Sequence, residues 1–129
     1  MNHPEIATAL LQLEVAALDL AHFCNLEAPE FAGAWRQIAG NATATKRLQD
    51  TEDIRCLVQS GVMMFSYHPD SFMEAYAKRS DIDEMILVNA EFDRKKKSVA
   101  EAFGKLSLAF EDINDSVTSA SLFFSNFMI

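Results

Sequence analysis

The stretch that decides the fold is residues 82–127, IDEMILVNAEFDRKKKSVAEAFGKLSLAFEDINDSVTSASLFFSNF. Every seventh position in it is apolar, and from Val99 onward a second apolar position joins each repeat. The first set is Met85, Phe92, Val99, Leu106, Ile113, Ala120 and Phe127. The second set is Phe103, Phe110, Val117 and Phe124. Alternating steps of four and three are the spacing of a helix with one long apolar seam. The pattern therefore predicts a long C-terminal helix over about residues 81–127.

The basic run at residues 94–97 is a place where this helix could break. Cations are favoured in the last turn of a helix, and Ser98 with Glu101 could form a capping box for a second one. Against a break, the run contains no Gly or Pro, and the seven-residue count continues unshifted. We therefore expect one continuous helix, which could bend near residue 97, with a break into two helices there as the alternative. At about 68 Å it would exceed the roughly 36 Å diameter of a compact domain of this length, so part of it must project.

Helical patterns also precede this segment. Residues 6–24 are apolar around most of the helix, which predicts a largely buried helix whose polar residues form one narrow stripe. A second helix is expected to open at Pro29, where proline suits the first turn, and to stop at Gly40. A loop that runs into a helical turn at residues 46–48 is expected to follow it. The polar stripe of the first helix consists of Glu5, Thr8, Gln12, Asp19 and His22.

A third helix is expected to begin after a cap at Asp50 or Thr51 and to end before Pro69. Gly61 lies on its apolar face, which indicates either a close helix contact or a weak point. Ser71 and Glu74 form a capping box for a fourth helix. With little Gly and Pro and no alternating β-branched runs, the chain is predicted to be an all-α, single-domain helical bundle of five to six helices.

The composition limits the function classes. A net charge of −8 disfavours binding to nucleic acid or to an anionic membrane, because both attract clustered Lys and Arg. The apolar N-terminal stretch is interrupted by polar residues, so neither a signal peptide nor a membrane span is expected. Cys24 and Cys56 are isolated and are expected to be free, core-filling thiols, which favours a cytoplasmic protein.

No pattern points to catalysis, a metal or a cofactor. Asp19 and His22 have the spacing of a metal-binding pair, but a second acid–histidine pair is missing. Nothing around His22 or His68 marks a haem ligand, and neither cysteine has an adjacent base. The run at residues 94–97 is expected to be a solvated face, paired with nearby acids. We therefore expect no catalytic residue and a protein that is not an enzyme, with a metal- or haem-binding bundle as the third possibility.

Two acidic patches lie on the predicted long helix, and they could either bind a basic surface or only keep the chain soluble. The first patch consists of Asp81, Asp83 and Glu84, and the second patch consists of Glu111, Asp112 and Asp115. The leading hypothesis is an inhibitor or immunity-type protein that occupies a basic surface of a partner protein. The alternative is a structural or assembly protein that forms a homodimer through its apolar C-terminus, with Leu122, Phe123, Phe127 and Met128 at the contact.

Overall fold

The computed structural model describes residues 3–27, 29–67, 82–113 and 120–126, and within these ranges it contains helices and no strand. The predicted all-α helical bundle is confirmed. The helix expected at Ser71 lies outside the described residues. The elements are α1 (Pro4–Glu27), the 3-10 helix η1 (Pro29–Phe31), α2 (Ala32–Leu48), α3 (Thr51–Tyr67), α5 (Ile82–Ile113) and α6 (Ala120–Ser125).

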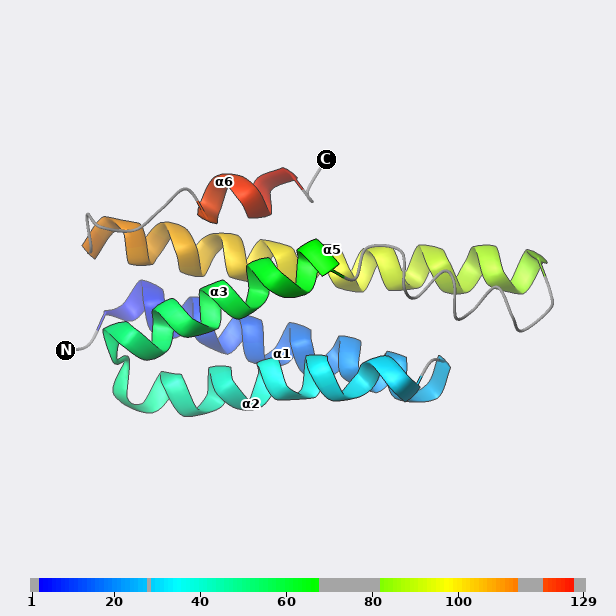
Figure 1. Ribbon diagram of the computed structural model, residues 1–129, viewed down its shortest axis with the longest axis horizontal. Coiled ribbons are helices and arrows are strands. Elements are labelled where there is room, and N and C mark those ends of the chain that lie inside the picture. Colours follow the sequence, from blue (N-terminus) through cyan, green and yellow to red (C-terminus); the bar gives the residue numbers. More distant parts are fainter. Residues whose placement is uncertain (1–2, 28, 68–81, 114–119, 127–129) are drawn as a thin grey trace.

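The helices form an elongated bundle in which α1 is the central member (Figure 1). It packs along α2 on one side and along α5 on the other, and the three run lengthwise. From the end of α2, α3 runs diagonally toward α5, while α6 lies along α5 on the side away from α1. The apolar residues that α1 turns into this bundle are fully buried, notably Ile6, Leu10, Leu13 and Leu20.

The junction between α2 and α3 is fixed by local hydrogen bonds. Gln49 adopts the left-handed conformation (φ 50°), and its N–H donates to the Thr45 carbonyl at 2.8 Å, which closes α2. Asp50 Oδ1 then accepts from the backbone N–H groups of Glu52 and Asp53 at 2.9 and 3.3 Å. The predicted cap at Asp50 is therefore confirmed.

The expected end of the second helix at Gly40 is wrong, because α2 continues to Leu48. Ala42 and Thr45 are both buried, so the small residues of this stretch allow α2 to pack closely. Gly40 itself is exposed and has no atom within 4 Å of where a Cβ would lie. Packing of the residues beyond it outweighs the intrinsic cost of one exposed glycine, which is about 1 kcal/mol.

An aromatic cluster joins the helices that lie far apart in the sequence. The ring of Phe65 in α3 meets Trp35 of α2 edge-on at 5.7 Å and Phe124 of α6 edge-on at 5.8 Å. It also meets Phe103 of α5 at 6.4 Å, and Phe103 stacks on Phe124 at 5.0 Å. All four residues are buried, so this cluster is the point at which α2, α3, α5 and α6 are held together.

The predicted single helix over residues 81–127 is wrong. Helix α5 runs uninterrupted through residues 94–98, as expected, but ends at Ile113, and α6 is a separate helix that lies back along α5. In one continuous helix Phe103 and Phe124 would be roughly 30 Å apart. Folding back instead stacks the two rings and buries both completely. The aromatic residues of the apolar seam are thus buried by packing α6 against α5.

Gly61 is a position where α3 lies close against α5. A Cβ built there would lie 2.6 Å from Cε1 of Phe103 and 2.7 Å from its Cζ. The Phe103 ring is stacked against Phe124 and abuts Phe65, so it has little room to move. Of the two predicted alternatives for Gly61, the close helix contact is therefore the one observed.

We predict that Gly61→Ala lowers the free energy of unfolding by about 1–3 kcal/mol, the usual cost of overpacking a filled core. Gly40→Ala is the matched control, since it adds the same methyl group to an open helical position and should stabilise by about 0.5–1 kcal/mol. Urea unfolding followed by circular dichroism measures both. Equal effects of the two substitutions would show that the contact with Phe103 does not constrain α3.

Candidate functional site

The first predicted acidic patch lies at the N-terminal end of α5. Asp83 and Glu84 are exposed in its first turn, where acids are favoured by the helix dipole; Asp81 lies outside the described residues. In the next turn of the helix Ile86 and Leu87 are 59% and 72% exposed. This end of α5 extends past the ends of α1 and α2 (Figure 1).

The second predicted patch has a structural role that the sequence did not reveal. The Glu111 carboxylate accepts hydrogen bonds from the Ser121 hydroxyl at 2.9 and 3.1 Å and from the Ser121 backbone N–H at 3.4 Å. These bonds tie the end of α5 to the start of α6. Asp112 lies in the last turn of α5, and Asp115 lies outside the described residues.

The predicted C-terminal contact residues fall into different environments. Leu122 is 68% exposed on α6. Phe123 packs partly buried against the core and meets the Phe124 ring edge-on at 5.3 Å. Phe127 and Met128 lie outside the described residues. Self-association through this end therefore stays a prediction, with Leu122 as the exposed residue among those described.

Asp19 and His22 are both exposed on α1. The Asp19 carboxylate pairs with the Lys95 ammonium of α5 at 2.7 Å. Within the ranges that the structure describes, no three His, Cys, Asp or Glu side chains are grouped closely enough to hold a metal ion. His68 lies outside these ranges. Of the two cysteines, Cys24 is buried as expected, whereas Cys56 is exposed, contrary to expectation.

The basic run at residues 94–97 is not the fully solvated face that was expected. Its predicted pairing with nearby acids is present, since Arg94 and Lys95 both bind Glu91. Lys96, however, is 9% exposed, and its ammonium lies 5.4 Å from the Phe65 ring centroid and 5.8 Å from that of Phe92. Such cation–π contacts stabilise a cation beside aromatic rings, so Lys96 belongs to the packing between α3 and α5.

The most extensive surface that sequence reasoning missed is an apolar stripe on α1. Leu11, Val15 and Leu18, spaced by four and three residues, lie on one face of the helix and are 49%, 59% and 49% exposed. Leu26, 66% exposed, lies further along the same side of the helix, beyond the exposed His22. The expectation of a largely buried helix is therefore wrong. Periodicity could not reveal this, because α1 is apolar on both its buried and its exposed faces.

Charged and polar contacts border this stripe on both sides. Toward α2, Glu14 pairs with Lys46 at 3.0 Å. Toward α5, Asp19 pairs with Lys95, and Lys105 Nζ lies 3.5 Å from Gln12 Oε1. Hydrogen bonds from Lys46 and then from Thr43 lower the pKa of Glu14. The stripe is thus an apolar strip with a polar rim, the usual anatomy of a protein interface.

A groove runs beside the stripe between α1 and α5. Its volume is about 490 Å³, and Leu108 on its α5 side is more than half exposed. Residues Glu5, Thr8, Ala9 and Gln12 of α1 and Lys105, Leu108 and Ala109 of α5 line it.

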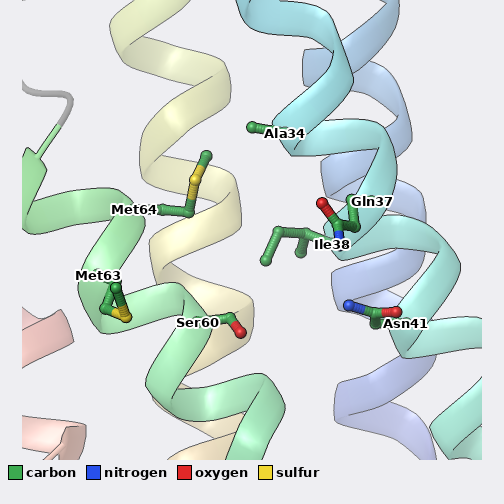
Figure 2. Close-up of a pocket in the computed structure, with 7 residues that line it drawn as sticks. All are labelled: Ala34, Gln37, Ile38, Asn41, Ser60, Met63 and Met64. Carbon is green, nitrogen blue, oxygen red and sulfur yellow. The ribbon is translucent and has the colours of Figure 1, made fainter.

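A second groove opens where α2 and α3 diverge (Figure 2). Its volume is about 500 Å³, and Met63 and Met64 border it on the α3 side, facing Ile38 of α2. Gln37, Asn41 and Ser60 give it polar edges, and Ala34 completes the lining. It is therefore an amphipathic cleft, and none of the described residues that line it is titratable.

By length and composition alone, α1 would be long and apolar enough to cross a membrane. The core helix of a soluble protein satisfies the same criterion, and α1 packs along α2 and α5. Comparison with known proteins adds no assignment, because no family model, curated protein or solved structure matches the chain.

We predict that the Glu14–Lys46 pair stabilises the packing of α1 on α2 in a pH-dependent way. Folding lowers the pKa of Glu14. The contribution of its ionised carboxylate to the free energy of unfolding is therefore fully present above the ordinary carboxyl pKa of about 4.3. It is lost as the pH falls through the folded-state pKa. Glu14→Gln should therefore cost up to about 1 kcal/mol at neutral pH and nothing at strongly acidic pH.

Urea unfolding of both proteins across this pH range measures the difference. Glu101→Gln is the matched control, because it removes an exposed pair with Lys105 within α5 and should cost only about 0.2–0.5 kcal/mol. A Glu14→Gln effect that is the same at every pH would contradict the role assigned to the ionised carboxylate.

Proposed function

We propose that this protein acts without chemistry of its own, by binding another protein that presents a basic surface. The observation that carries the proposal is the N-terminal end of α5. There the exposed acids Asp83 and Glu84 adjoin the exposed apolar residues Ile86 and Leu87. Large apolar side chains exposed together commonly mark contact sites, and the acids beside them select a cationic partner.

The position of this end supports the same function. It extends past α1 and α2, so neither of these two helices covers its exposed side chains. Phe92 anchors the helix behind it, with its ring 6.4 Å from that of Phe23 in α1. A helix that is packed at its base and extends beyond these neighbours can enter a concave site without reorganising the rest of the bundle.

Electrostatics would add speed and selectivity to such binding. The chain has a net charge of −8, which attracts a basic partner over a distance and repels anionic competitors. Once the surfaces meet, burial of Ile86 and Leu87 would supply the short-range affinity, and the acids at the rim would fix the orientation. An inhibitor or immunity-type protein that covers a basic functional surface uses this combination.

A homo-oligomeric assembly is the second candidate function. The exposed stripe on α1 favours it, because that surface is nearly neutral and apolar and does not select a basic partner. The stripe and the end of α5 are different surfaces, so the two functions do not exclude each other.

To test the proposal, a photo-reactive amino acid is placed at Leu87, and cross-linked proteins are identified in an extract of the native host. The same group at the exposed Gln59 of α3 is the positional control. A protein captured from position 87 and not from position 59 is then purified, and its association rate is measured as ionic strength rises.

We predict that Asp83→Asn with Glu84→Gln slows association about tenfold at low salt, and that salt removes this difference. Glu52→Gln with Asp53→Asn is the control, since it neutralises two acids in the first turn of α3 and should change the rate little. Equal rates for the two paired variants, or a rate independent of salt, would show that the end of α5 does not recognise a basic surface.

A further inference from the structure

The apolar stripe on α1 has the arrangement of a surface that matches itself. Its three central residues are nearly symmetric about Val15, since Leu11 lies four residues before it and Leu18 three residues after it. If a second copy of α1 crosses antiparallel at Val15, each Leu11 meets the Leu18 of the other copy. Such reciprocal contacts define a two-fold interface.

The charges around the stripe favour this antiparallel arrangement. On the α5 side, Lys105 lies beside Gln12, and Asp19 lies further toward the end of α1. Reversing the direction of the second helix brings its Asp19 level with residue 10 or 11 of the first, next to Lys105. Two Asp19–Lys105 pairs would therefore form across the interface, one on each side of the axis.

Lysines and acids both border this face. Lys46, Lys95 and Lys105 lie around the stripe and pair with Glu14, Asp19 and Glu101 of their own chain, although the whole chain carries a charge of −8. Two copies repel each other when acidic surfaces meet, whereas the lysines around this face can be shared with an acid of the second copy. Charge complementarity thus selects this face for contact between copies.

The groove between α1 and α5 provides room for the second helix. If the α1 helix of the second copy crosses at Val15, its C-terminal half passes over Thr8 and Gln12 of the first copy. Both residues line the groove. Leu18 and Leu26 of the second copy then lie toward Leu108. The stretch from Leu11 to Leu26 is about 22 Å long, so a stable dimer must also bury the polar rim and the groove to approach the roughly 800 Å² per partner of a specific interface.

We propose that two copies of this protein pair through α1, antiparallel and centred on Val15, with the stripe of each copy entering the α1–α5 groove of the other. This pairing does not depend on the binding function assigned to the end of α5. It also differs from self-association through the C-terminus, because α6 lies on the side of α5 away from α1.

Sedimentation equilibrium of the full chain tests the pairing. The wild type is expected to be a dimer at micromolar concentration. Val15→Lys sets two ammonium groups against each other at the axis and should weaken dimerisation at least about tenfold. Leu122→Lys is the matched control, since it puts the same charge on an exposed leucine of α6, and it should leave the dimer intact. Circular dichroism checks that both variants keep their helix content.

A charge exchange tests the orientation. Asp19→Lys and Lys105→Glu should each weaken the dimer, and the two changes together should recover part of the loss, because opposite charges again meet across the interface. No recovery in the double variant would overturn the antiparallel arrangement.

Disulfide formation gives a readout that does not rely on weakening the dimer. In a Cys56→Ser background, Val15→Cys should form a covalent dimer under mild oxidation, because the two positions meet at the axis. Gln59→Cys, on α3, should form no covalent dimer under the same conditions. Equal cross-linking from both positions would overturn the proposal.

Three further results would overturn the pairing. The first is a wild type that stays monomeric at high micromolar concentration. The second is a dimer that Leu122→Lys dissociates and Val15→Lys does not. The third comes from flotation with phosphatidylcholine vesicles, to which the wild type is expected not to bind. Flotation of the wild type that Val15→Lys abolishes would show that the stripe binds lipid instead of a second copy.

Discussion

The fold depends on the contact of the Phe65 ring with aromatic residues from three other helices. Trp35, Phe103 and Phe124 surround it, and each such aromatic pair contributes about 0.5–1.5 kcal/mol beyond the burial of its area. Gly61, one turn before Phe65, is required because any side chain there would occupy the space of the Phe103 ring. Even the buried ammonium of Lys96 is placed by this cluster, over the face of Phe65. The diagonal course of α3, and with it the groove between α2 and α3, follows from this constraint.

Apolar surface remains exposed because α1 has more apolar faces than its neighbours cover. One side of the helix is buried between α2 and α5, and the opposite side carries Leu11, Val15 and Leu18 into solvent. The ion pairs of Glu14 and Asp19 fix this orientation from both flanks. In the proposed dimer the two α1 helices are antiparallel, so the acidic ends of the two α5 helices would project in opposite directions. Each end would then be free to bind its own partner, and the assembly would be bivalent.

Local sequence signals predicted helix caps and helix continuity well. They predicted less well the features that depend on tertiary packing, such as the end of α2 and the contacts of Glu111. Asp50 caps α3 as expected, and α5 continues through its basic run because no residue there opposes a helix. At Gly40 the glycine signal failed, since burial of Ala42 and Thr45 sustains the helix beyond it. Among the candidate site residues, Asp83 and Glu84 are exposed as a binding patch requires. Glu111 is instead held by Ser121, a partner ten residues away that no periodicity indicates.

The sequence by itself determined that the chain is helical, acidic and rich in apolar seams, because helix period, caps and charge are properties of neighbouring residues. Only the tertiary structure decided that the seam folds back after Ile113, because stacking Phe124 on Phe103 buries two rings that a straight helix would leave apart. It also decided which apolar side of α1 faces the core. A helix that is apolar on both sides can bury either one, and the choice is made by the partners that pack against it.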